Sequence, residues 1–125
     1  IGTAPGSDNA GAAMFADMAS AAGIDGTSVY AGESYDAAAL MLLAMAAAGS
    51  KEPGDYASHV FHVANAPGEP INPGELGKAL EILAAGGQID YQGATGVELI
   101  GPGESAGSYR EIEIKDGAVT TVKYR

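Results

Sequence analysis

The segment from Asp36 to Ala48 constrains the fold more than any other part of the chain. Its sequence, DAAALMLLAMAAA, predicts a helix over residues 36–48 that is apolar on nearly every side. A helix that is apolar all round is buried all round, and its alanine-rich faces let other elements approach closely. Such a helix needs a layer of structure on each side, and in α/β proteins one of these layers is a sheet. Ser34 is the expected N-cap, and Gly49 ends the helix.

Three more segments have helical patterns. Apolar residues at helical spacing and start and stop signals predict helices over about 8–22, 53–64 and 74–85. Ser7 is the expected N-cap of the first, and Pro53 fits the first turn of the second. The third follows Asn72-Pro73-Gly74-Glu75, a variant of the capping box.

The chain offers little β-structure to cover these helices. Residues 27–31 predict one short strand, and residues 1–6 are read as the end of a strand or a linker. Asp116-Gly117 is a two-residue hairpin turn that joins predicted strands over 109–115 and 118–124. Residues 101–107 are predicted to be a flexible loop. Four helices with so little sheet predict a piece of a larger α/β protein, or a chain that a partner completes.

Composition supports the same interpretation. The 125 residues include 19 glycines and many alanines, so the bulky apolar set is small for a self-sufficient core. We therefore expect that the chain does not fold stably by itself.

Charge and cysteine content exclude several classes of function. The net charge of −10 repels phosphate backbones and anionic lipids, which argues against nucleic-acid binding and against docking on a membrane surface. Because there is no cysteine, disulfides, thiolate nucleophiles and cysteine-bound zinc are excluded. No apolar run reaches the length of about 20 residues that crosses a bilayer.

An ordered set of short motifs resembles the C-terminal part of type I periplasmic solute-binding proteins, in particular the receptors for branched-chain amino acids and amides in ABC importers. None of these motifs is specific alone, but together they cover nearly the whole chain in the family's order. They are Gly2-Thr3-Ala4-Pro5, Glu33-Ser34-Tyr35-Asp36-Ala37-Ala38, Ala48-Gly49-Ser50, Ile89-Asp90-Tyr91-Gln92-Gly93-Ala94-Thr95-Gly96, and Gly103-Glu104 followed by the final hairpin from Tyr109.

This resemblance implies two Rossmann-like lobes that close on a solute and dock on a membrane permease. Residues 1–6 would form a crossover segment, and residues 7–100 the C-terminal part of the first lobe. Residues 101–125 would supply a crossover loop and the hairpin of the second lobe. The preceding remainder of the same protein would be a partner of this segment. The implied location is the periplasm, or the cell exterior with a lipid anchor where there is no outer membrane.

Three residues near residue 30 are the candidate ligand contacts. By the resemblance, Tyr30 lines the cleft, although it could equally be a tyrosine of the core. Glu33 and Ser34 follow at a helix start, where backbone N–H groups bind polar ligands; simple capping by Ser34 is the alternative. Tyr35 is interpreted as a packing residue, and Asp36 as a charge that compensates the helix dipole.

The sequence gives no sign of catalysis, metal or cofactor. Glu33 and Asp36 are a poor carboxylate pair for glycoside hydrolysis, because such pairs come from separate elements. His59 and His62 lie three residues apart without an evident third ligand, so we expect a solvated helix face. No serine stands in a nucleophile elbow. A binding function is therefore expected, in a transport receptor or in a sensor of the same fold. A hydrolase fragment and an interaction module are the alternatives of other classes.

Overall fold

The computed structural model describes residues 1–125, which form a mixed α/β structure with four helices and three small sheets. The helices are α1 (Ala10–Ala21), α2 (Ala31–Ala48), α3 (Pro53–Ala64) and α4 (Leu76–Ala84). The strands are β1 (Gly2–Pro5), β2 (Glu69–Ile71), β3 (Ile89–Tyr91), β4 (Leu99–Gly101), β5 (Glu104–Ser105), β6 (Tyr109–Lys115) and β7 (Ala118–Tyr124).

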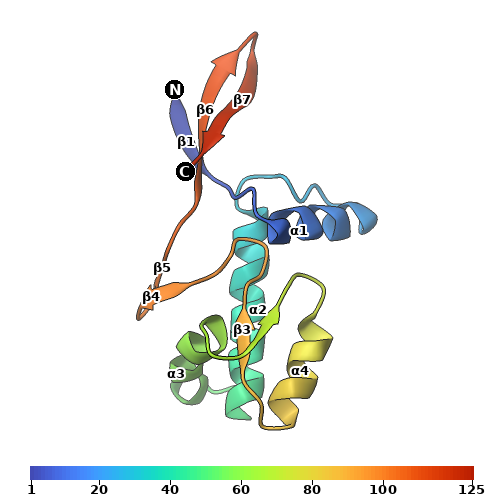
Figure 1. Ribbon diagram of the computed structural model, residues 1–125, viewed down its shortest axis with the longest axis vertical. Helices are drawn as coiled ribbons and strands as arrows, with labels where there is room; N and C mark the ends of the chain where they lie inside the picture. Colours follow the sequence, from blue (N-terminus) through green and yellow to red (C-terminus); the bar gives the residue numbers. More distant parts are fainter.

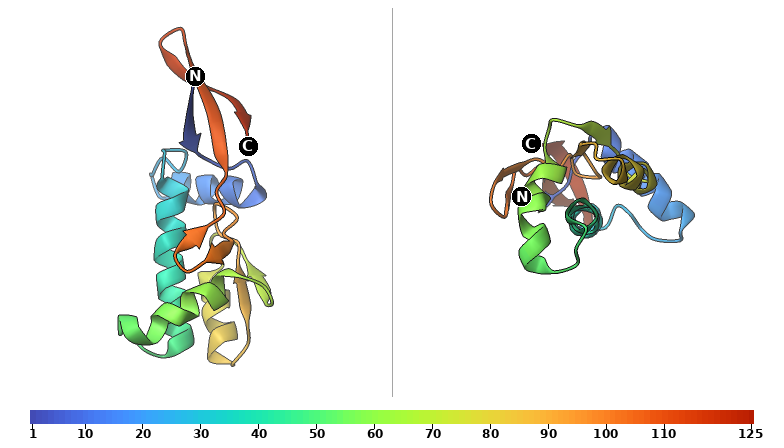
Figure 2. Two further views of the ribbon diagram at one scale, coloured as in Figure 1. Left: turned by 90° about the vertical axis from the view of Figure 1, so that its left-hand side faces the viewer. Right: turned by 90° about the horizontal axis from the view of Figure 1, so that it is seen from below.

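The molecule is elongated, with the longest helix as the axis of its helical body (Figure 1). Seen from below, α2 lies end-on between α3 and α4 (Figure 2). The antiparallel sheet β1-β6-β7 projects from the end of this body where α1 lies. β2 and β3 form a parallel pair beside α4, and β4 and β5 a small antiparallel pair.

The main hydrophobic core lies between α2, α3, α4 and the β2-β3 pair. α2 contributes small and large residues to it, and both parallel strands contribute fully buried side chains. The buried members are Ala39, Leu40, Leu43, Ala44, Val63, Ala64, Ile71, Ala79, Ile89, Tyr91 and Val97. A second cluster of Phe15, Ala19 and Ala94 joins α1 to the start of α2, where Tyr35 packs on Phe15 with ring centroids 5.1 Å apart. The packing role expected for Tyr35 is thus confirmed.

The apolar helix α2 is covered on one face only. Leu40 and Leu43 are buried, whereas Met41 and Leu42 are 48% and 57% exposed. The sheet β1-β6-β7 likewise leaves Ile114 and Val119 largely exposed. The prediction of burial on every side is therefore wrong for this chain by itself, since it contains no layer that covers the second face.

Each predicted helix is present, and three begin at a different residue. α3 spans 53–64 as expected. α1 is capped by Asn9, whose side chain accepts from the Ala12 N–H, and not by Ser7. α2 begins at Ala31, so Ser34 lies inside its first turn and donates its N–H to the Tyr30 carbonyl. α4 begins at Leu76, after the Glu75 carboxylate accepts from the Asn72 N–H.

The strand predicted for residues 27–31 is wrong. The Asp25 carboxylate accepts from the backbone N–H and hydroxyl of Thr27 and from the Ser28 hydroxyl. Such local bonds compete with sheet formation. Tyr30 then takes a left-handed conformation with φ 68°, which starts α2 and cannot continue a strand.

The terminal hairpin is confirmed at both of its predicted ranges. β6 and β7 pair from Lys115↔Ala118 down to Arg110↔Tyr124. Asp116 and Gly117 both have positive φ, as the two-residue turn requires. The loop predicted for 101–107 instead contains β5 and the end of β4. None of the helices has the length and apolar character that crossing a bilayer demands.

Candidate functional site

A pocket of about 280 Å³ opens where the root of the β1-β6-β7 sheet meets α1 and the first turn of α2. Four separate parts of the chain line it: the β1-α1 connection, the turn before α2, the loop after β3, and the ends of β6 and β7. Its lining includes Ser7, Asp8, Asn9, Phe15, Thr27, Ser28, Glu33, Ala94, Thr95, Arg110 and Tyr124. We call it the junction pocket.

One side of the junction pocket is fixed by the buried carboxylate of Asp36. Oδ1 accepts from the Tyr91 hydroxyl at 2.9 Å and from the Ala94 N–H at 2.8 Å. Oδ2 accepts from the N–H and the hydroxyl of Thr95 at 2.8 and 2.6 Å. The side chain thus ties the loop after β3 to α2, and this corrects the expectation that Asp36 only compensates the helix dipole.

Burial and the neighbouring carboxylate raise the pKa of Tyr91 far above its ordinary value. Desolvation of the phenolate is the larger cause, and the negative charge of Asp36 adds to it. Tyr91 therefore stays a neutral donor to Asp36 across the physiological range of pH.

Two glycines permit the close packing of this wall. Gly93 has φ 60°, and a Cβ there would overlap Asp36 Oδ1 and approach Tyr91 Cε1 at 2.6 Å. A Cβ on Gly11 would overlap the carbonyl oxygen of Gly93, so α1 lies directly against the loop. Gly93 of the Tyr91–Gly96 motif thus has a steric reason, as does Gly11 of α1.

The lining polar groups are mostly hydrogen-bond acceptors. Thr27 and Ser28 donate their hydroxyl protons to Asp25, and Thr95 donates its own to Asp36. These hydroxyl oxygens therefore offer lone pairs to a ligand. Hydrogen bonds from Thr27, and to a smaller extent from Ser28, also lower the pKa of Asp25. Its carboxylate therefore stays ionised, and accepts these bonds, to lower pH. With the carboxylates of Asp8 and Glu33 the pocket suits an ammonium or amide donor.

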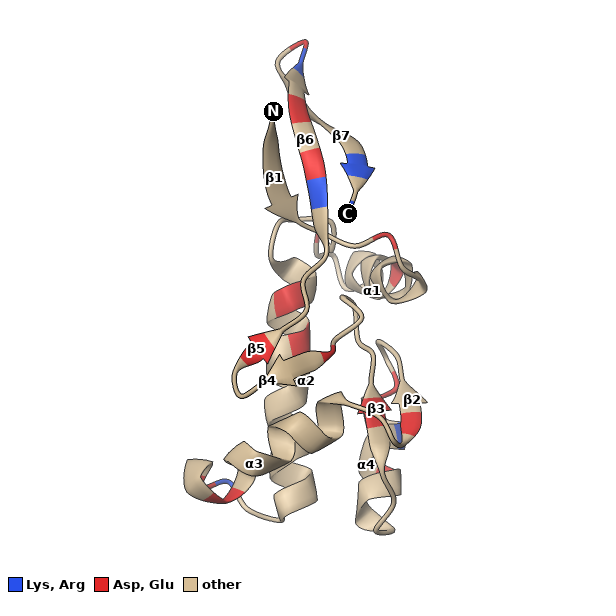
Figure 3. Cartoon of the chain, turned by 60° about the vertical axis from the view of Figure 1, so that its left-hand side comes forward, with Lys and Arg blue, Asp and Glu red and all other residues tan.

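Charged residues of both signs occur near this end of the molecule. Asp and Glu residues lie in the first half of α2 and on β6, and Lys and Arg residues lie on β6 and β7 (Figure 3). Among the residues that line the junction pocket, Arg110 is the only cation beside the two carboxylates.

Of the three candidate ligand contacts, Glu33 lines the junction pocket. Tyr30 is 61% exposed at the start of α2, and Ser34 is exposed one residue beyond Glu33; neither lines this pocket. Their role in ligand binding stays a prediction.

The two histidines border a second pocket of about 300 Å³ between α3 and the turn before β3. The His59 and His62 rings lie 6.4 Å apart, and His62 Nδ1 is 2.9 Å from the Ser58 carbonyl oxygen. No group of three or more His, Cys, Asp or Glu side chains converges here or elsewhere in the chain.

Comparison with known proteins yields one partial match. The chain is 34% identical over 93 residues to the chemotactic signal transduction system substrate-binding protein BasB of Halobacterium salinarum. The match covers 74% of this chain but 22% of that protein, so it spans about a fifth of the relative's length. No family model and no solved structure matches the chain.

The matched protein is named for substrate binding. This agrees with the expectation of a binding function. The branched-chain receptor family implied by the sequence motifs is a finer assignment than this match carries.

Proposed function

We propose that this chain is part of an extracytoplasmic solute receptor that binds a hydrophobic amino acid, an amide or a similar small molecule in the junction pocket. The observation that carries the proposal is the convergence of four chain segments, with two carboxylates and three acceptor hydroxyls, on one pocket. Its similarity to a substrate-binding protein supports the same class of function.

Charge and size fit a small polar ligand. The volume of about 280 Å³ lies near the lower end of the range for small-molecule sites. Glu33 and Asp8 would hold an ammonium or amide group, and Phe15 with the nearby alanines would contact an apolar side chain.

The exposed apolar surfaces support the proposal that this chain is one segment of a two-lobed receptor. Met41 and Leu42 on α2 would pack against sheet from the first lobe, which would also extend the β2-β3 pair. The β1-β6-β7 sheet would belong to the crossover and the second lobe. Closure of the lobes would then present the loaded receptor to an ABC permease.

A thermal-shift screen of amino acids and their amides on the complete protein tests the proposed function. A ligand that binds only the native state raises the melting temperature in proportion to the logarithm of its concentration once binding saturates. Glu33→Gln should weaken the response, whereas Glu52→Gln, on an exposed residue before α3, should not. No shift with any compound at millimolar concentration would refute the proposal.

A sensor of the same fold is the second candidate, because the matched relative is named for chemotactic signal transduction. Both candidates use the same ligand pocket. A pull-down from detergent-solubilised membranes with the loaded receptor would distinguish them, since capture of a permease favours transport and capture of a signal transducer favours sensing.

A further inference from the structure

The terminal hairpin brings a guanidinium group to the junction pocket. Arg110 lies near the start of β6, opposite Ala4 of β1 and Tyr124 of β7. Its Nε is the only buried side-chain nitrogen or oxygen atom in the chain without a hydrogen-bond partner. Because buried polar groups are nearly always paired in native proteins, this donor calls for a partner that the chain does not supply.

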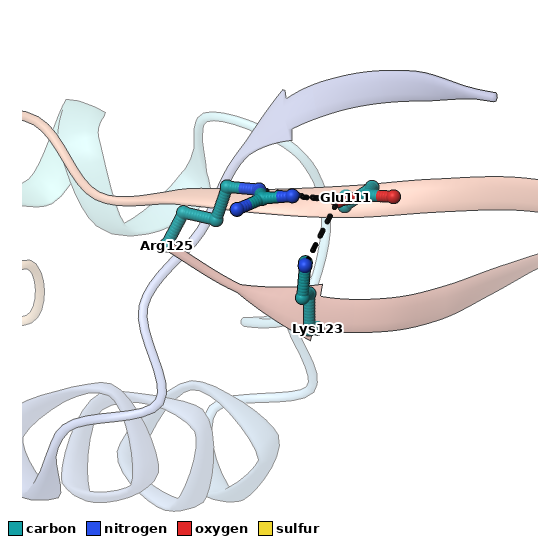
Figure 4. Close-up of polar contacts among 3 residues, drawn as sticks. All are labelled: Glu111, Lys123 and Arg125. Carbon is teal, nitrogen blue, oxygen red and sulfur yellow. Dashed lines mark hydrogen bonds and ion pairs between the residues drawn. The ribbon is translucent and has the colours of Figure 1, made fainter.

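The two other cations at this end of the sheet, Lys123 and Arg125, are already engaged, and Lys115 lies at the far end of β6 beside the hairpin turn. The Glu111 carboxylate accepts from Arg125 Nη2 at 2.7 Å and lies 3.9 Å from Lys123 Nζ (Figure 4). Successive side chains of a strand alternate between its faces, so Arg110 lies on the opposite face from Glu111. No ion pair joins Arg110 to any carboxylate of the chain, Asp8 and Glu33 included.

The β1-α1 connection makes room for the stem of this arginine. A Cβ on Gly6 would lie 3.2 Å from Arg110 Cδ and 3.3 Å from Cγ, which is tighter than ordinary packing. Glycine at this position therefore lets the aliphatic part of Arg110 lie close against the chain where the sheet meets α1.

We propose that Arg110 binds the anionic group of the ligand, an inference that rests on the proposed function and narrows its substrate class. A guanidinium pairs with a carboxylate through parallel N–H···O bonds. Asp8 and Glu33 meanwhile attract a cation in the same pocket. The two signs of charge together select a zwitterionic amino acid over the corresponding amide, which keeps the ammonium but lacks the carboxylate.

Matched ligands and matched arginines test this inference in the complete protein. Calorimetry compares an amino acid that gives a thermal shift with its own amide, beginning with L-leucine and L-leucinamide. Arg110→Gln should weaken binding of the amino acid about 10-fold or more and change amide binding less than about 3-fold. Arg125→Gln is the control, because Arg125 directly follows β7 but pairs with Glu111 and does not line the pocket.

The outcomes separate this inference from the function on which it rests. Arg110 does not bind the anionic group if Arg110→Gln binds the amino acid as tightly as the wild type, or if its affinity for both ligands falls equally. The proposed receptor function would stand in either case. If the screen yields only ligands without an anionic group, the inference is also overturned. If no compound binds at all, the proposed function fails first. Arg110→Lys, which keeps the charge but loses the planar fork, should give an intermediate affinity.

Discussion

Asp36→Asn is the substitution with the clearest expected consequence. The carboxylate accepts four hydrogen bonds, two of them from backbone amides of Ala94 and Thr95. An asparagine has one acceptor oxygen in place of two, and its NH2 group must face one of these amides in either orientation. The hydroxyls of Tyr91 and Thr95 can turn to accept from that NH2 group, but a backbone N–H cannot.

The expected loss of stability comes from the backbone N–H that is left without an acceptor. One buried donor without a partner costs about 1–3 kcal/mol, and hydrogen bonds to a charged acceptor are about twice as strong as neutral ones. We therefore expect Asp36→Asn to destabilise the loop after β3 by roughly 2–4 kcal/mol. Since 1.4 kcal/mol is a factor of ten, local opening should become about 30- to 1,000-fold more frequent.

Amide hydrogen exchange at Ala94 and Thr95 in the complete protein measures this opening directly. Asp17→Asn on α1 is the matched control, because Asp17 is exposed and has no hydrogen-bond or ion-pair partner. Its effect should stay within about 0.5 kcal/mol. If the Asp36 variant exchanges at the rate of this control, the carboxylate does not hold the loop and the account of the junction-pocket wall is wrong.

Three further outcomes follow from the same structure. Gly93→Ala should lower the melting temperature sharply, because a Cβ would strike Asp36 and the backbone has φ 60°, whereas Gly54→Ala, with open space around it, should have little effect. Because the pKa of Tyr91 is raised in the folded state, its contribution to stability is complete below the unfolded value of about 10 and is lost as the pH rises above it; in urea unfolding at rising alkaline pH the wild type should therefore lose stability more steeply than Tyr91→Phe. Raising salt from about 0.1 to 1 M should raise the melting temperature, because it screens repulsion within a net charge of −10, and a fall would contradict the view that this repulsion outweighs the few surface ion pairs.

The helices and the terminal hairpin could be predicted because local signals determine them. Pro53 at a helix start and Asp116-Gly117 at a turn act within a few residues, and both were located correctly. The parallel pair β2-β3 could not be predicted, since each strand has three residues and too few positions to show alternation. Its register places Ile71 opposite Tyr91, and both side chains join the core that α2 covers, which depends on packing between distant parts of the chain.

The candidate site was predictable only in part for the same reason. Glu33 was found from its position near a helix start, and it does line the junction pocket. Asp36 is close to the same helix start, but the three residues that donate its four hydrogen bonds lie more than 50 residues away along the chain. Arg110 belongs to no recognisable sequence motif. Its proposed role rests on the buried, unpaired Nε atom, which is evident only in the folded chain.

The two halves of the pocket differ in how they are supported, and this bears on how a receptor of this kind would work. Tertiary contacts hold the helical side of the pocket together, because Asp36 binds the loop after β3 and Phe15 packs on Tyr35. The Arg110 half is attached through β1 and β6, which reach the helical body by the short connection at Gly6 and by the chain before Tyr109. A ligand that bridges Glu33 and Arg110 would therefore link the helical body to a sheet that is joined to it by two short connections. Binding energy gained at that bridge is available only when the sheet lies against the helices, and this is how a ligand favours a closed arrangement over an open one.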